Sequence, residues 1–179
     1  MIPAAWALPG PAFPDSGLYI LLLALEAPAA LRIGALGTFT LPSGTYLYTG
    51  SARRGLRARV ARHLAPDKAL RWHIDYLTTA PGTRRIGAVG FPAQFPVRFP
   101  GRAGGQNLSE CELNRRAGAL AGWTAPVPGF GAGDCRAGCP AHLWYTGRHL
   151  SLDHLVGLEA APAQSFQSGA PRPPTIPSA

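Results

Sequence analysis

The longest uninterrupted apolar segment, residues 18–25, most constrains the fold of this chain. It contains no charged or amide side chain, so it lacks the alternation of a strand with one face in water. Such a run is typical of a β-strand covered on both faces. It is far shorter than the ~20 apolar residues that a membrane-spanning helix needs. We therefore expect an interior strand and no contact with a membrane.

Other segments alternate between strand and helix patterns. Residues 45–49 are aromatic and β-branched, as strands prefer, whereas Leu56, Val60 and Leu64 recur at helical spacing before Pro66. The pattern further predicts a short strand or hairpin over 31–40, a helix over 72–77, a strand over 85–91, loops over 91–105 and 128–138, a helix over 109–121, a strand over 142–146 and a short helix over 152–158. We expect an α+β fold, a small mixed or antiparallel sheet flanked by helices.

Proline-rich segments bracket the predicted domain. Residues 1–16 read as a flexible arm, and residues 161–179 combine five prolines with small residues, as disordered tails do. The folded domain is expected over residues 17–160. Residues 1–10 lack the basic start of a signal peptide. Three cysteines, an odd number, favour a reducing compartment, so we predict a cytoplasmic protein.

The charge of the chain is strongly positive. It has 17 Lys and Arg against 9 Asp and Glu, a net charge of +8 and a pI near 10.3, and Lys68 is the sole lysine. Arginine forms bidentate contacts with phosphate that lysine does not form, which indicates a nucleic-acid partner. A genome rich in G and C would also replace Lys by Arg, and the abundant Ala, Gly and Pro fit that reading equally well.

Five ordered blocks resemble a known superfamily. A Gly17-Leu18-Tyr19 strand, a Tyr48-Thr49-Gly50 strand, a basic helix and a later Glu-bearing helix are similar to GIY-YIG nucleases. More closely, they resemble a branch that occurs alone or fused to endonuclease III-type DNA glycosylases. The blocks that carry this resemblance are residues 44–52, 62–64, 72–77, 110–113 and 129–135. The resemblance implies a DNA-repair endonuclease, with nucleic acid, mainly DNA, and a repair protein as partners.

Two tyrosines are candidates for the reacting site. The resemblance implies that one of Tyr19 and Tyr48 helps to activate water and the other shapes the phosphate site. Aromatic residues on strands more often only pack in the core. A phenol with a pKa near 10 is a poor base, so we expect a nearby arginine or a metal to lower that pKa. Tyr46, two residues before Tyr48, points to the same strand face and competes with it.

The basic helix carries the candidate phosphate ligands. Arg59 lies beside the apolar stripe, so we expect it to be partly buried and to clamp the scissile phosphate, or else to cover apolar surface with its stem. His63 either assists proton transfer or is a structural histidine. Nonspecific contacts with the nucleic-acid backbone are assigned to Arg53, Arg54, Arg57 and Arg62.

Two glutamates compete for a divalent cation. Mg²⁺, or Mn²⁺ in its place, takes one or two protein carboxylates, so one Glu would suffice. The resemblance favours Glu110 over Glu112. Both also have helix-capping spacing, Ser109 with Glu112 and Asn107 with Glu110. The superfamily usually carries an Asn after this helix, and the only Asn beyond Glu110 is Asn114, within the helix.

A second group of residues has partial metal-ligand spacing. Cys135, Cys139 and His142 could begin a zinc site that Cys111 or His73 completes. The spacing is irregular and there is no second Cys pair, so buried cysteines and a core histidine are the favoured reading. His73, Asp134 and His142 are kept as possible additional site residues. The competing function is a catalytically silent module that binds nucleic acid or recruits a repair enzyme.

Overall fold

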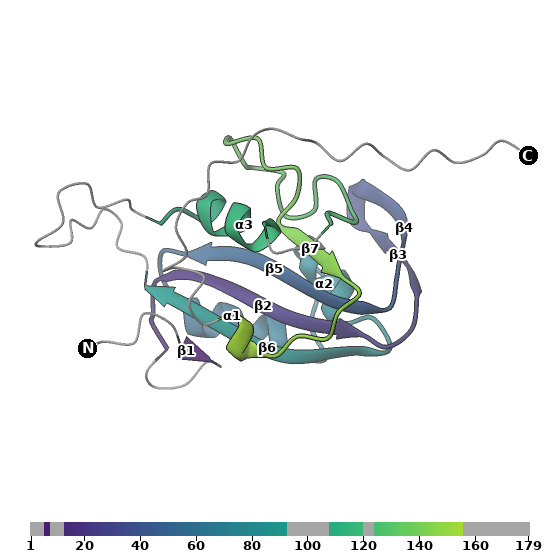
Figure 1. Ribbon diagram of the computed structural model, residues 1–179, viewed down its shortest axis with the longest axis horizontal. Coiled ribbons are helices and arrows are strands. Elements are labelled where there is room, and N and C mark those ends of the chain that lie inside the picture. The colour runs from purple at the N-terminus through teal and green to yellow at the C-terminus, as the bar shows by residue number, and fades with distance from the viewer. Residues whose placement is uncertain (1–5, 8–12, 93–107, 120–123, 156–179) are drawn as a thin grey trace, which may run out of the picture.

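A five-stranded antiparallel sheet forms the centre of the computed structural model, which describes residues 6–7, 13–92, 108–119 and 124–155 (Figure 1). Its strand order is β1-β6-β2-β5-β7. The strands are β1 (Trp6–Ala7), β2 (Gly17–Leu25), β5 (Gly44–Ala52), β6 (Thr83–Pro92) and β7 (Leu143–Thr146). The predicted α+β class is confirmed.

The predicted interior strand is β2. It pairs along its length with β5 on one side and β6 on the other, and all nine of its residues are buried. Its side chains alternate between two separate cores: Tyr19, Leu21 and Leu23 belong to one, and Leu18 and Ile20 to the other. The continuous apolar run follows from this, because each sheet face is covered.

Helices cover the two faces of the sheet. The amphipathic helix α1 (Leu56–Leu64) and the short α2 (His73–Thr78) pack on one face through Val60 and Ile74, behind the sheet in Figure 1. Helix α3 (Glu110–Gly118) packs on the other face through Leu113. It is accompanied there by a short 3-10 turn, η2 (Leu152–His154).

A separate hairpin lies at one end of the sheet. Strands β3 (Ala29–Ile33) and β4 (Gly37–Leu41) pair antiparallel, with the 3-10 turn η1 (Gly34–Leu36) between them. Ile33 and Leu41 close onto the α1 and α2 side of the core. The expected short strand or hairpin over residues 31–40 is confirmed with slightly wider bounds.

The structure differs from expectation at the ends of the domain. Trp6–Ala7 pairs with Val89 and Gly90 of β6, and Phe13 is 3% exposed, so this part of the expected arm belongs to the fold. Within the described residues α3 ends at Gly118, before the predicted residue 121. The loop predicted over 91–105 starts later than expected, because Phe91 and Pro92 belong to β6. Its residues 93–105 and the tail at 161–179 lie outside the described residues.

Among the described residues, we find no helix with the length and apolar character needed to cross a bilayer.

Candidate active-site cleft

A cleft of about 350 Å³ lies beside the end of β5, beyond the residues that pair with β7. Among the described residues, β7 pairs with Thr45 to Tyr48 and Thr49 donates to the His142 carbonyl, so the residues of β5 beyond Thr49 form a free edge. Around this edge the cleft is lined by Tyr19, Tyr48, Gly50, Ser51, Arg59, Arg71, Trp72, His73, Glu110, Gly131, Gly133 and Asp134. Four residues expected on separate segments, Tyr19, Tyr48, Arg59 and Glu110, thus meet in one place.

Tyr19 and Tyr48 form the aromatic floor of the cleft. Their ring centroids are 6.3 Å apart. The Tyr19 hydroxyl is hydrogen-bonded to Nε2 of His63 at 3.0 Å. Tyr46 points elsewhere, donating its hydroxyl proton to the Pro42 carbonyl and packing on Tyr145. Of these two tyrosines of β5, Tyr48 therefore lines the cleft and Tyr46 does not.

Of the arginine or metal expected to lower a phenol pKa, the arginine acts in that direction but brings neither pKa below its usual value. Burial, with the neighbouring phenol, raises the pKa of Tyr19 well above its usual value, and burial likewise raises that of Tyr48. Arg59 acts in the lowering direction on both, but its effect is smaller than that of burial. Both phenols therefore stay protonated at neutral pH and act as hydrogen-bond donors or acceptors.

Arg59 is half-buried at the edge of the α1 stripe, as expected. Its Nη1 donates to the carbonyl of Ser51 at 2.9 Å, which fixes the guanidinium at the free edge of β5. Its Cζ also lies 5.4 Å from the ring centroid of Trp72, a cation–π arrangement. A guanidinium has five N–H donors, so this group can also interact with the Tyr19 hydroxyl and still offer donors to a ligand in the cleft.

The other arginines predicted to bind phosphate do not line the cleft. Arg53, Arg54 and Arg57 are exposed and lie outside the cleft lining. Arg62 instead forms a bidentate pair with Asp75, which is 0% exposed, at 3.0 to 3.2 Å. Arg71 lines the cleft although no sequence pattern singled it out. The structure therefore uses Arg62 internally and offers Arg71 to a ligand.

The two candidate glutamates have different partners. Glu112 forms ion pairs with Arg115 and Arg116 on its own helix, and its N–H is capped by Ser109. Glu110 reaches the cleft, where it accepts a short hydrogen bond from Ser51, and its Oε1 lies 2.9 Å from Nδ1 of His142. The structure therefore places Glu110, and not Glu112, in the cleft.

Electrostatics keeps Glu110 ionised. Burial alone would raise the pKa of its carboxyl, but the contacts with His142 and Ser51 hold that pKa below its usual value. Burial lowers the pKa of His142, but Glu110, Cys135 and Cys139 together outweigh burial, so that the pKa of this histidine rises to about 9. The cleft therefore contains a carboxylate at neutral pH.

Asn114 binds the surrounding elements together. It is 1% exposed; its Oδ1 accepts from the Thr49 hydroxyl at 2.6 Å and from the Trp144 indole N–H at 2.8 Å. Its Nδ2 donates to the Ala141 carbonyl at 2.8 Å. One side chain on α3 thus connects β5, β7 and the loop that precedes β7.

Two of the additional candidates line the cleft. His73 accepts a hydrogen bond on Nδ1 from the N–H of Gly131 at 3.0 Å, so in the neutral ring the proton is on Nε2. Burial lowers the pKa of His73, which favours that neutral form. Asp134 is exposed at the rim. The third candidate, His142, lies behind Glu110, beside the three cysteines.

Gly50 permits the close approach of Tyr19. A Cβ at this position would lie 2.5 Å from Cζ of the Tyr19 ring. We expect Gly50→Ala to destabilise the fold by about 1 to 3 kcal/mol, measured by urea unfolding, because the buried ring cannot yield freely. Gly133→Ala is the matched control, since nothing lies within 4 Å of its Cβ. In the double variant, Tyr19→Leu should recover part of the stability lost by Gly50→Ala. If the stability changes of the two single variants simply add in the double variant, this packing is contradicted.

His63 does not line the cleft but lies behind Tyr19, 2% exposed. Burial, aided by Lys68, lowers its pKa to about 4 although Asp75 lies 3.7 Å from Nδ1. The unfolded chain therefore binds a proton near pH 6.5, where the folded chain does not, and stability falls as pH drops from 6.5 to 4.

The wild type loses stability between pH 7.5 and pH 5, and we expect His63→Gln to make this loss about 2 kcal/mol smaller. Denaturant unfolding of both proteins at the two pH values measures this difference. An equal loss in both proteins would show that His63 does not titrate in this way. Exposed His149, replaced by Gln, is the control and should leave the loss unchanged.

The predicted partial metal motif is more complete than the sequence spacing indicates. Cys111, on α3, lies beside Cys135, Cys139 and His142, so the structure joins residues that the sequence separates. His73, the alternative fourth ligand, instead faces Gly131.

A scan against protein families matches residues 18–160 to the domain of unknown function DUF123. The match covers most of the chain, and the protein belongs to this family. Searches of the curated proteins and of the solved structures gave no match.

Proposed function

We propose that the cleft binds a nucleic-acid strand and hydrolyses one of its phosphodiester bonds with the help of a divalent cation. The observation that carries this proposal is the meeting of Tyr19, Tyr48, Arg59 and Glu110 in one cleft. The resemblance to GIY-YIG nucleases had assigned these four residues complementary roles.

The cleft offers several donors to a phosphate. Arg59 and Arg71 supply positive charge, and His73, with its proton on Nε2, supplies a neutral donor. The hydroxyl of Tyr48 has no hydrogen-bond partner among the described residues, and its raised pKa keeps its proton in place. Fixed donors of this kind stabilise the extra negative charge of a phosphodiester in its transition state.

The same cleft contains acceptors for a cation. Glu110 is ionised and 30% exposed at its side chain, and Asp134 adds a second carboxylate. Hard oxygen ligands of this number suit Mg²⁺ or Mn²⁺, whose remaining positions water and phosphate fill. A cation bound there would polarise the phosphate and acidify its bound water. Hydrolysis would join a water oxygen to the phosphorus and break the bond to the leaving sugar oxygen, which would take up a proton from that water.

The proposal is tested by cleavage of branched, flapped and single-stranded DNA, and of RNA, with Mg²⁺ or Mn²⁺. We expect the wild type to cut at least one substrate, Glu110→Gln to lose about 100-fold or more in rate, and Glu112→Gln to be close to wild type. Glu112 is the matched control because it is the same residue type, two positions away, paired outside the cleft. Equal rates in both variants would contradict the assignment.

One observation favours a second candidate, a binding module without turnover. Both oxygens of Glu110 already have partners, Ser51 on Oε2 and His142 on Oε1. If those contacts exclude a cation, the protein would bind nucleic acid in a salt-sensitive manner and cut none of the substrates. The same assay, run with a binding measurement at two salt concentrations, separates the two functions.

The biological setting is part of the proposal. The resemblance supports a role in DNA repair, with DNA as the main partner and a repair enzyme as a second. The three cysteines form no disulfide, which is the state that a reducing cytoplasm maintains.

A further inference from the structure

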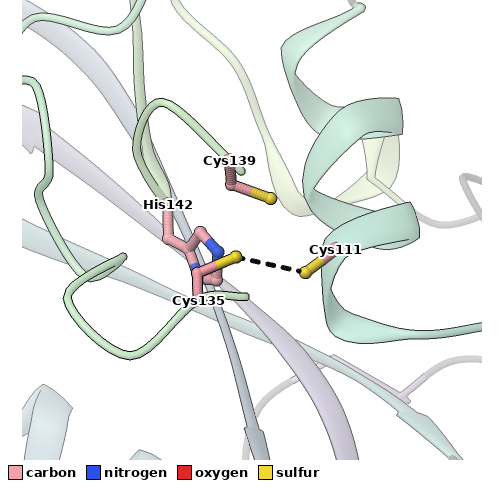
Figure 2. A group of neighbouring side chains, drawn as sticks. All are labelled: Cys111, Cys135, Cys139 and His142. Carbon is pink, nitrogen blue, oxygen red and sulfur yellow. Dashed lines mark hydrogen bonds between the residues drawn. The ribbon is translucent and has the colours of Figure 1, made fainter. Parts of the chain in front are cut away.

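Four potential metal ligands come together beside the cleft. Cys111 extends from α3, and Cys135, Cys139 and His142 come from the loop before β7, as Figure 2 shows. The ligand atoms of all four residues lie within 4.8 Å of one another. The group includes all three cysteines of the chain.

The separations are close to those of a tetrahedral zinc centre. Zn–S bonds of about 2.3 Å place two sulfur ligands about 3.8 Å apart. Sγ of Cys111 and Sγ of Cys135 are 3.5 Å apart, and no pair in the group exceeds 4.8 Å. Side-chain adjustments of about 1 Å would therefore be enough to close a Cys3His site, a ligand set that structural zinc commonly has.

His142 provides an independent sign that a ligand is missing from its surroundings. It is 3% exposed, and neither of its ring nitrogens has a hydrogen bond of good geometry. Its Nδ1 lies 2.9 Å from Oε1 of Glu110, which leaves Nε2 buried without a partner. A carboxylate on one ring nitrogen and a metal on the other is the usual arrangement of a zinc-binding histidine.

The loop that carries these ligands is held by few apolar contacts, although the N–H of its Gly131 donates to His73. From Gly131 to Pro140 no residue is buried, and the segment contains three glycines and no large apolar side chain. Fixing the backbone of such a loop costs about 1 kcal/mol or more per residue in conformational entropy. A metal–thiolate centre supplies the binding energy that the missing apolar burial does not.

We propose that Cys111, Cys135, Cys139 and His142 bind one Zn²⁺ ion as a structural centre. The ion would join α3 to the loop before β7 and, through His142, hold Glu110 at the wall of the cleft. A disulfide between Cys111 and Cys135 is the competing use of these sulfurs, but it would leave Cys139 and the buried Nε2 of His142 without a function.

The proposal is tested on the full chain, purified under reducing conditions, by elemental analysis and by titration of accessible thiols. We expect about one zinc per chain and thiols that react only after a strong chelator is added. Cobalt exchanged into the site should give the intense visible absorption of a tetrahedral thiolate complex. Zinc well below one equivalent with freely reactive thiols, or a Cys111–Cys135 disulfide, would overturn the proposal.

Ligand variants locate the site. Cys135→Ser and Cys139→Ser should each lower the zinc content at least severalfold, and His149→Ala, an exposed histidine outside the cluster, should keep it. If the serine variants do not fold, the cobalt spectrum and thiol protection of the wild type still decide. None of these measurements uses nucleic acid, so their outcome is independent of whether the cleft cleaves DNA.

Discussion

Replacing Arg59 by alanine is expected to lower the rate of phosphodiester cleavage by about 100- to 1,000-fold. The guanidinium is held at the free edge of β5 by the Ser51 carbonyl, with its other donors available to a phosphate in the cleft. Loss of a fixed donor to a transition-state oxyanion has an effect of this size. Single-turnover cleavage of a labelled DNA substrate measures it.

Arg57→Ala is the control for this variant. Arg57 lies on the same helix but is exposed and does not line the cleft. We expect it to weaken binding slightly, mainly at low salt, and to leave the cleavage step unchanged. Arg59→Lys should recover little of the activity, because an ammonium group lacks the planar set of donors. Full activity of Arg59→Ala would refute the assigned phosphate contact.

Replacing Asn114 by leucine is expected to destabilise the fold by about 3 kcal/mol or more. The change leaves the Thr49 hydroxyl, the Trp144 N–H and the Ala141 carbonyl without their partner on α3. Each buried polar group left unsatisfied costs about 1 to 3 kcal/mol. Chemical unfolding of the wild type and the variant at neutral pH gives the difference directly.

Two further variants interpret that result. Asn114→Asp keeps an acceptor for Thr49 and Trp144 but sets an oxygen against the Ala141 carbonyl, so an intermediate or larger loss is expected. Arg115→Ala, an exposed partner of Glu112 on the same helix, should change stability by less than about 1 kcal/mol. A loss for Asn114→Leu as small as that for Arg115→Ala would show that the network contributes little.

The elements of this fold could be read from local patterns. The apolar run at residues 18–25 and the helical spacing of Leu56, Val60 and Leu64 each report the surroundings of one segment, and β2 and α1 form where expected. The flexible arm predicted over residues 1–16 is wrong at Phe13, which is buried because it contacts Gly90 of a distant strand. No local pattern reports such a contact.

The site was predictable where a side chain's position follows from its own element. Arg59 at the edge of an amphipathic helix is such a case. Arg71 and Trp72 are not, since their place in the cleft depends on a loop whose N–H groups are held by the buried carboxylate of Asp75. The cysteine group depends likewise on Cys111, 24 residues before Cys135, meeting a loop from another part of the chain.

The central claim is that the cleft at the free edge of β5 receives a phosphodiester, and a crystal structure with a short DNA strand tests it most directly. Ca²⁺ in place of Mg²⁺ would slow cleavage and keep the strand intact. We predict a phosphate within hydrogen-bond distance of Arg59 and Tyr48, and a cation bound to Glu110. DNA bound only to the exposed arginines Arg53, Arg54 and Arg57, with no phosphate in the cleft, would contradict the account.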